Sequence, residues 1–394
     1  MSIQQSEKTV EQGPIVWEPE DAEEAVRLKR QYGAEAVFVA GGTLLRTQWE
    51  NGVAAFPQHM IRLDTIPGIT DIQEHADSLL IGALSSLKQV GIHKQVEQYA
   101  AVLYSACKHI AAPSIRHLAT IGGNIASAVG DALPALLVHH ARLVWADSDR
   151  TDIIYEQSVV DWMDQLRKGQ KNAQAVLLGI HFPKEPVDAA AHIAMDPTSA
   201  SHDLGGLATV NTKSDQVQSN YDKQHHADND TLLRLKRDDR HIVSDDMHTL
   251  SDERHMLSSG GMKDSASVQL WSDQHGETWR ELGFFRKLGR REAFTPSLVT
   301  VAFRAWIAED GRLLHVRIAA GGGSGLGMRL YNCEQWLEGQ IYDPSITTQL
   351  AELVTAEFVS YSDPFATDTY RQRSAGNLLA AGLWESIQAM GKRG

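Results

Sequence analysis

The sequence has very little cysteine: its 394 residues include two, Cys107 and Cys333. A disulfide framework, a zinc site made of Cys-x-x-Cys pairs and a four-cysteine iron–sulfur cluster each need more cysteines than that. Redox chemistry in this chain must therefore use a bound organic cofactor or a partner subunit. We expect both cysteines to be buried thiols in a reducing compartment.

Long apolar runs and excess positive charge are also missing. No run approaches the roughly 20 apolar residues that cross a bilayer, and the polar start, residues 1–12, lacks the apolar core of a signal peptide. Lys and Arg number 37 against 50 Asp and Glu, which gives a net charge of −13. Such a surface repels phosphate backbones and anionic lipid headgroups. These absences predict a cytoplasmic protein without nucleic-acid or membrane partners.

The apolar residues, 42% of the chain, follow mixed strand and helix periods over residues 1–187. Asp21, with acidic residues just after it, is typical of a helix start, and that helix should end near Gly33. We expect an α/β composition with antiparallel pieces, divided into subdomains at about 1–66 and 67–187. The expected strands are 15–17, 36–40, 60–63, 69–73, 79–81, 143–145 and 176–182, and the further helices are 97–110 and 133–140.

Residues 188–276 have a different character, because Asp, Ser, His, Lys and Gln dominate and no period there could bury a face. Such a long loop is uncommon inside a compact domain, so we expect a mobile insertion. Its histidines match no metal-ligand spacing, and we expect no metal site. Over residues 277–394, strand patterns come first and helical patterns follow, which predicts a separate α+β unit. Its expected elements are an ordered stretch at 279–294, a hairpin of strands 298–307 and 313–319, and helices 329–337, 347–359 and 368–387.

Two glycine-rich turns are the clearest functional signals. Ala-Gly-Gly-Thr at 40–43 follows an apolar strand, and Ala-Thr-Ile-Gly-Gly-Asn at 119–124 precedes a stretch of small residues. Paired glycines allow positive φ and remove Cβ atoms, so successive N–H groups can converge on one anion. Either pair alone is more often a simple turn. Two such turns that meet in space could bind the two phosphates of a dinucleotide from opposite sides.

Other nucleotide motifs are not matched. Neither turn fits G-x-G-x-x-G, and no acidic residue lies at the ribose-binding offset, which disfavours an ordinary Rossmann NAD site. The run from Gly321 to Gly327 lacks the Lys-Ser/Thr ending of a phosphate loop, so it predicts a flexible turn.

Two charged features complete the candidates. Asp131 precedes a helix and is either its N-cap or an acceptor for cofactor hydroxyls. Arg286, Lys287, Arg290 and Arg291 form a basic cluster flanked by phenylalanines. A charge run is usually a solvated face, but the aromatic neighbours favour a cleft in which a cation stabilises negative charge on a ligand or a reduced cofactor.

Together these motifs resemble the FAD-binding (medium) subunit of molybdenum hydroxylases, a group that includes xanthine dehydrogenase and carbon monoxide dehydrogenase. The stretch Phe284–Phe294 is most similar to xanthine dehydrogenase subunits of bacterial purine catabolism. The likeness covers nearly the whole chain outside the polar insertion. It rests on Ala-Gly-Gly-Thr at 40–43, Ala-Thr-Ile-Gly-Gly-Asn at 119–124, Gly-Asp with a following Pro at 130–134, Ile-Arg-His-Leu-Ala at 115–119 and Asp-Thr-Tyr-Arg at 368–371.

The resemblance implies an α+β architecture. Residues 1–187 would form a two-subdomain FAD-binding fold of the PCMH/vanillyl-alcohol-oxidase type, and 277–394 a C-terminal α+β domain with a small antiparallel sheet and helices, like that of the CO dehydrogenase flavoprotein. FAD would lie between the two subdomains. The flavin itself would be the redox group, so no catalytic side chain and no metal ligand is expected.

The resemblance also implies individual FAD contacts. The pyrophosphate would rest on backbone amides of both glycine turns, with Ile121 against the flavin ring. Asp131 would lie near the ribityl or ribose hydroxyls, and Lys287 or Arg291 near the polar edge of the isoalloxazine. The cofactor-binding residues expected in this way are Ala40, Gly41, Gly42, Thr43, Leu44, Thr120, Ile121, Gly122, Gly123, Asn124, Asp131, Lys287 and Arg291.

The function implied is electron transfer. Electrons from a substrate hydroxylated at molybdenum would pass through 2Fe-2S clusters to FAD and then to NAD, with xanthine dehydrogenase as the expected enzyme. This chain lacks cysteines for the clusters, so an iron–sulfur subunit and a molybdopterin-binding large subunit are the expected partners. Two alternatives stay open: a self-contained FAD-dependent reductase of the UDP-N-acetylmuramate dehydrogenase type, and a flavin-free scaffold subunit.

Overall fold

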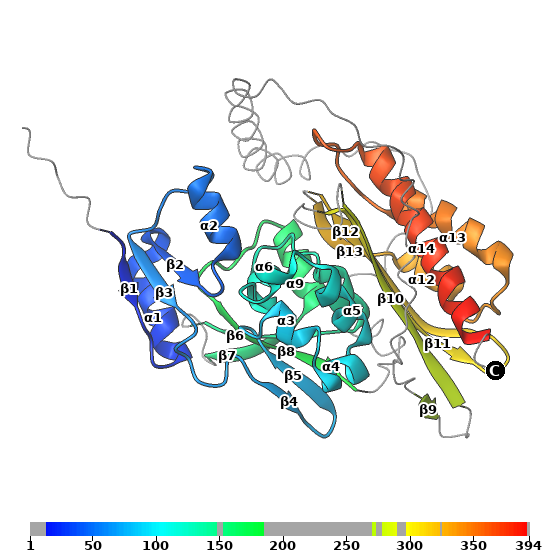
Figure 1. Cartoon of the computed structure of the whole chain (residues 1–394), viewed down its shortest axis with the longest axis horizontal. Helices are drawn as coiled ribbons and strands as arrows, with labels where there is room; N and C mark the ends of the chain where they lie inside the picture. The colour runs from blue at the N-terminus through cyan, green and yellow to red at the C-terminus, as the bar shows by residue number, and fades with distance from the viewer. Residues whose placement is uncertain are drawn as a thin grey trace, which may run out of the picture.

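The computed structural model describes residues 13–147, 153–184, 270–272, 278–289, 297–323 and 325–391. Three β-sheets with their helices follow one another along the long axis of the molecule (Figure 1). The predicted insertion lies outside the described residues except for 270–272. We keep the division into 1–187, 188–276 and 277–394 as a proposal. No helix in the described ranges is both long and apolar enough to cross a membrane.

The first sheet is parallel, with strand order β1-β3-β2. Helix α1 begins as predicted at Asp21, whose carboxylate accepts a hydrogen bond from Glu24 N at 2.7 Å, and ends at Gly33. Helix α2 follows the first glycine turn directly and was not predicted. The elements are β1 (Ile15–Trp17), α1 (Ala22–Tyr32), η1 (Gly33–Glu35), β2 (Ala36–Val39), α2 (Thr43–Glu50) and β3 (His59–Arg62).

The second sheet is antiparallel, with strand order β4-β5-β8-β6-β7. Short helices from the segments between its strands bury the central core, which includes Leu103, Ile121 and Leu136. The elements are β4 (Ile72–Glu74), β5 (Ser78–Gly82), α3 (Leu87–Val90), α4 (Lys94–Tyr99), α5 (Ala101–His109), α6 (Pro113–Arg116), α7 (Ile121–Ala126), α8 (Leu133–Val138), β6 (Arg142–Ala146), β7 (Ile154–Ser158), α9 (Val159–Arg167) and β8 (Val176–Pro183).

Three local predictions differ from the structure. The single helix expected over 97–110 is two helices, because Ala100 leaves helical geometry with φ −138° and ψ 51°. Strand β4 starts at Ile72 rather than 69, since a turn closed by Asp71 N and Gly68 O comes first. Strand β7 and helices α3, α6, α7 and α9 were not predicted.

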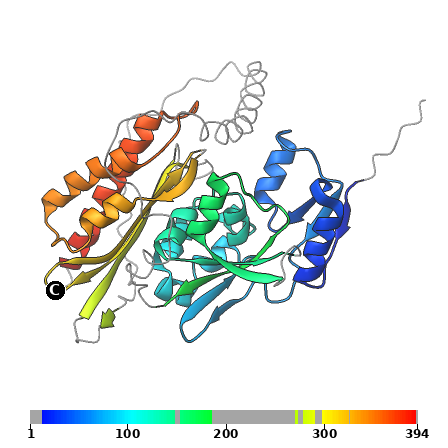
Figure 2. The same cartoon turned by 180° about the vertical axis from the view of Figure 1, so that it is seen from behind.

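The third sheet is antiparallel, in the order β13-β12-β11-β10-β9. Helices α13 and α14 cover its outer face, as both views show (Figure 1 and Figure 2). The predicted flexible turn at 321–327 instead forms the end of β12 and the start of β13, with Gly322 paired to Gly325. The elements are β9 (Leu270–Ser272), β10 (Thr278–Gly289), β11 (Ser297–Ala308), β12 (Leu313–Gly322), β13 (Gly325–Arg329), α12 (Tyr331–Leu337), α13 (Pro344–Glu357) and α14 (Asp368–Gly391).

The inner face of this third sheet packs on α5 and α8 of the central region. Phe285, Ala302 and Ala319 are neighbours across β10, β11 and β12, and all three belong to the central core. The adjacent residue Phe284 faces the other way and stacks on Phe303, with ring centroids 5.2 Å apart. Alternate residues of β10 therefore fill two different cores, as the two-residue period of a strand requires.

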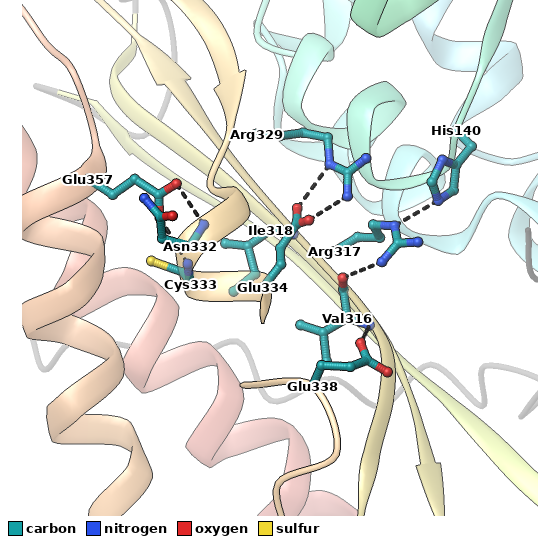
Figure 3. A network of polar contacts seen from close by, with 10 residues as sticks. All are labelled: His140, Val316, Arg317, Ile318, Arg329, Asn332, Cys333, Glu334, Glu338 and Glu357. Atoms are coloured by element: carbon teal, nitrogen blue, oxygen red, sulfur yellow. Dashed lines mark hydrogen bonds and ion pairs between the residues drawn. The ribbon is translucent and has the colours of Figure 1, made fainter. Parts of the chain in front are cut away.

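Polar contacts join the same two regions (Figure 3). The buried Arg317 of β12 donates from Nε to His140 Nε2 at 2.8 Å, just beyond α8. Glu334 of α12 accepts from Arg329 Nε at 2.9 Å and from Ile318 N at 2.9 Å. Because buried charges are costly unless they are paired and hydrogen-bonded, the Glu334–Arg329 pair holds α12 on the third sheet, and the Arg317–His140 bond joins that sheet to the central region.

Candidate functional site

The first glycine turn presents free backbone donors. Strand β2 ends at Val39, and Gly42, with φ +66°, is the N-cap of α2 without a side-chain capping bond. Within the described residues, no backbone acceptor is found for the N–H groups of Gly41, Gly42 and Thr43. A Cβ built on Gly42 would meet nothing within 4 Å. Three successive N–H groups at a helix N-terminus, beside open space, form an arrangement that suits an anion.

The second glycine turn is built differently, because its N–H groups are already used. Thr120 is the N-cap of α7, and its side chain accepts from Gly123 N at 3.0 Å. The N–H of Ile121 donates to Ser85 O at 3.0 Å and that of Gly122 to Ala83 O at 2.7 Å. Both the Gly122 and the Gly123 amides thus have protein acceptors in this structure, and the expected contact of a pyrophosphate with them stays a prediction.

The two turns meet through backbone contact, as the sequence predicted. A Cβ on Gly41 would lie 1.8 Å from Leu118 O and 3.3 Å from Ala119 Cα, one residue before Thr120. A Cβ on Gly122 would lie 2.6 Å from Ala83 O. Glycine is required at Gly41 and Gly122 because backbone passes where a side chain would start.

The side chains around the second turn divide between core and surface. Ile121 is completely buried in the central core, and its expected contact with the flavin ring stays a prediction. The exposed face of α7 instead carries Gly123 and Ala126, three residues apart. Ala126 was not among the predicted residues, although its helical spacing from Gly123 places both residues on one face of α7. In the first turn, Ala40 and Thr43 are half-buried and Leu44 is exposed.

Asn124 and the loop after α7 form a fixed unit. The Asn124 side chain accepts from Ala132 N at 3.1 Å, and a Cβ on Gly130 would lie 2.2 Å from Asn124 Oδ1. Asn124 therefore positions the loop that carries Asp131. The N-cap of α8 is Ala132, with no side-chain capping bond, so the N-cap alternative for Asp131 is wrong.

Asp131 instead forms an ion pair with Lys287 of β10. Their charged atoms are 2.7 Å apart, and the side chains are 15% and 11% exposed. The structure thus brings together two predicted site residues from opposite ends of the chain. Arg286, their neighbour in sequence, pairs with Glu385 of α14 at 2.8 Å, and Arg290 and Arg291 lie outside the described residues. The described part of the basic cluster is therefore split between the two faces of the sheet.

The cysteines and other possible metal ligands point to no further chemistry. Burial raises the pKa of the Cys107 thiol to about 12, while Arg116 lowers it, and burial also raises the pKa of the Cys333 thiol. Both stay protonated at neutral pH and are poor nucleophiles and ligands. Across the described ranges, no three His, Cys, Asp or Glu side chains come close enough to bind a metal.

The arrangement fits both the diphosphate and the hydroxyl groups of a dinucleotide. The free N–H groups of Gly41, Gly42 and Thr43 match the negative oxygens of a diphosphate. The open space beside Gly42 leaves room for its approach. Asp131 supplies a carboxylate that can accept hydrogen bonds from hydroxyl groups, and Lys287 supplies a cation beside it.

Comparisons with known proteins agree with this geometry. Residues 8–185 match the family model of the FAD binding domain in molybdopterin dehydrogenase, and residues 284–386 match that of the CO dehydrogenase flavoprotein C-terminal domain. The 6-hydroxypseudooxynicotine dehydrogenase complex subunit alpha of Paenarthrobacter nicotinovorans is 28% identical over 50% of this chain and 66% of its own length. The nicotinate dehydrogenase FAD-subunit of Eubacterium barkeri is 32% identical over 32% of this chain and 43% of its own length.

The similar solved structures cover nearly the whole chain. A chain of carbon monoxide dehydrogenase from Hydrogenophaga pseudoflava superposes with a TM-score of 0.64 at 17% identity, over 96% of this chain and 98% of that one. A chain of quinoline 2-oxidoreductase from Pseudomonas putida 86 gives the same TM-score at 16% identity, over 96% and 98%. These likenesses confirm the predicted fold. The chain therefore contains an FAD binding domain like that of molybdopterin dehydrogenase over residues 8–185 and a CO dehydrogenase flavoprotein C-terminal domain over residues 284–386, and its cofactor is FAD.

Proposed function

We propose that the diphosphate of FAD binds to the N–H groups of Gly41, Gly42 and Thr43. The free donors of these three residues carry the proposal. The partial positive charge at the start of α2 adds to their attraction for an anion, in a chain whose net charge is −13. Ala40 and Leu44 flank these donors, and Gly123, Asn124 and Ala126 form the facing side of the proposed site.

Asp131 and Lys287 have a complementary proposed role at the other end of the cofactor. Asp131 accepts hydrogen bonds from ribityl or ribose hydroxyls, and Lys287 places a cation near the ring. Their ion pair of 2.7 Å, with both side chains largely buried, supports this role. Arg291 stays a proposed contact near the ring. Bound FAD supplies the redox chemistry, while the chain supplies binding, orientation and charge.

We further propose that the chain is the electron-transfer subunit of a multi-subunit molybdenum hydroxylase. Its two cysteines are buried and protonated, so 2Fe-2S clusters and molybdopterin belong to an iron–sulfur subunit and a large subunit. The names of the relatives include "complex subunit alpha", "FAD-subunit" and "medium chain". The proposed compartment is the cytoplasm. Affinity purification of the tagged chain from its own cells should yield three subunits, and recovery of this chain alone would contradict the proposal.

The finer proposal is xanthine dehydrogenase activity with NAD as the acceptor. It rests on the resemblance of the stretch Phe284–Phe294, of which 290–294 lie outside the described residues. The relatives are named for other substrates: nicotinate, 6-hydroxypseudooxynicotine and carbon monoxide. Flavin bleaching in the purified complex under anaerobic conditions, with xanthine, nicotinate or carbon monoxide, distinguishes them. Bleaching by nicotinate or carbon monoxide but not by xanthine would overturn the assignment to purine catabolism. If NAD is added to the reduced complex and no NADH forms, the assignment of NAD as the electron acceptor would be overturned.

The proposed FAD site has a direct test on the chain alone. If the diphosphate is the main anchor, protein stripped of flavin should bind FAD far more tightly than FMN or riboflavin, and ADP should compete with FAD better than AMP does. Quenching of flavin fluorescence measures these affinities. Equal affinity for riboflavin and FAD would contradict the placement of the diphosphate. Turnover of NADPH by the isolated chain would instead favour the UDP-N-acetylmuramate dehydrogenase type.

A further inference from the structure

The segment between α5 and the second glycine turn has an unusual backbone. Ala111, in the turn after α5, has φ +55°, a left-handed conformation that is unfavourable for a residue with a Cβ. Pro113 then starts α6, a single turn that ends at Arg116. Such a conformation persists only where other contacts stabilise it.

Arg116 supplies those contacts. Its NH1 group donates to Ala111 O at 2.7 Å and to Ile110 O at 3.3 Å. Its backbone N–H donates to Ala112 O at 3.0 Å. One residue therefore binds three successive carbonyl groups, and a charged donor makes the stronger kind of hydrogen bond. The turn and α6 form a closed, rigid unit.

This unit leads directly to the contact between the two glycine turns. Leu118 O, two residues after Arg116, is the atom against which Gly41 packs, and Ala119 O accepts from Leu87 N at 2.8 Å. The approach to the second turn is thus fixed at one end by Arg116 and at the other by Leu87. Where Leu118 lies decides where Gly41 lies, and Gly41 begins the row of free N–H groups.

We propose that Arg116 is a positioning residue for FAD: by fixing Leu118 against Gly41, it sets the distance between the first glycine turn and the facing side of the site. The proposal rests on the FAD site proposed above. Arg116 acts through the backbone and needs no contact with the cofactor, since its guanidinium is bound to Ala111 O and Ile110 O.

The test compares Arg116→Met with the wild-type full-length chain, after both are stripped of flavin. Arg142→Met is the matched control, because Arg142 on β6 pairs with Glu156 at the surface. We expect the dissociation constant for FAD to rise about tenfold or more in Arg116→Met and to stay unchanged in Arg142→Met. Arg116→Lys, which can still donate to Ala111 O, should recover part of the affinity.

A purely structural role and a direct phosphate contact predict different results. Affinities are measured well below the unfolding midpoint of each stripped protein, so a loss of global stability alone leaves them unchanged. The dependence of the affinity on ionic strength should be the same in wild type and Arg116→Met, because the proposed role involves no ion pair with phosphate. Wild-type affinity in Arg116→Met, or a clearly weaker salt dependence, would overturn the proposal. Failure of the wild-type chain to rebind FAD would instead overturn the FAD site itself.

Discussion

The two glycine turns contain the same dipeptide and use it for different physical reasons. In the first turn, Gly42 has φ +66° and faces open space, and three N–H groups have no backbone acceptor in the described residues. In the second, the Gly122 N–H donates to Ala83 O and the glycine has no room for a Cβ. One turn leaves its donors without a backbone acceptor, and the other lets two pieces of backbone touch. A glycine pair alone therefore does not identify a ligand contact.

The largest effect should come from filling the second turn. Gly122→Ala places a Cβ 2.6 Å from Ala83 O, and backbone has to move, so we expect a loss of about 3 kcal/mol in the free energy of unfolding. Gly123→Ala is the matched control, because its Cβ meets only Thr120 Oγ1, at 3.1 Å. Denaturant unfolding of both variants checks the difference. If Gly122→Ala and Gly123→Ala were equally stable, the close approach of backbone at Gly122 would not be what requires a glycine there.

The next effect concerns the carboxylate that follows the second turn. Lys287→Met leaves Asp131 largely buried without its cation, and we expect a loss of about 2 kcal/mol. The double variant Lys287→Met with Asp131→Asn should recover part of that loss, because the unpaired charge is gone. Thermal and denaturant unfolding of the flavin-free protein measure both. If Lys287→Met left the free energy of unfolding unchanged, the ion pair would contribute nothing to holding the loop that carries Asp131 against β10.

Adding a side chain to the first turn should weaken FAD binding more than it lowers the stability of the fold. Gly42→Ala and Gly52→Ala are a matched pair, because both glycines have φ +66° and neither has a neighbour within 4 Å of a built Cβ. Each should cost about 1 kcal/mol of stability. FAD affinity should fall about tenfold in Gly42→Ala only, since its Cβ enters the space beside the free N–H groups. A fluorescence titration in which both variants weaken FAD equally would remove the distinction between the turns.

The smallest effect should come from the cap of α7. Thr120→Val removes the acceptor of the Gly123 N–H and should cost about 1 kcal/mol, whereas Thr120→Ser keeps the hydroxyl and the stability. FAD affinity should change less than in Gly42→Ala, because the proposed anchor of the diphosphate is the first turn and not the freed Gly123 N–H. A larger loss of FAD in Thr120→Val than in Gly42→Ala would reverse the roles of the two turns.

The sequence predicted the meeting of the turns but not their hydrogen bonds. The spacing of 40–43 and 119–124 and the resemblance predicted one site, and Gly41 does pack on Leu118. The partners of the second turn, Ala83 O and Ser85 O, follow β5, and nothing in their residue types marks them as acceptors. Backbone partners depend on the path of the chain, which composition and motif spacing do not encode.

Side-chain direction was predicted least well. Ile121 is apolar and follows a capping threonine, and the sequence alone cannot tell whether such a residue faces a ring or the core. The start of α7 at Ile121 decides this, because it turns Ile121 and Ile125 inward and Gly123 and Ala126 outward. The pairing of Asp131 with Lys287 could not be predicted from the sequence either. The two residues are 156 positions apart, and they meet because the third sheet packs on the central region.

The alternation along β10 has a consequence for dividing this protein. Phe285 completes the core of the FAD-binding region, while Phe284 belongs to the core beneath α14. A fragment that stops before β10 would uncover an apolar strip on α5 and α8, and a fragment that starts there would uncover the matching strip on the sheet. Expressed separately, the two fragments should aggregate or bind to each other, so this protein is best produced as a single chain.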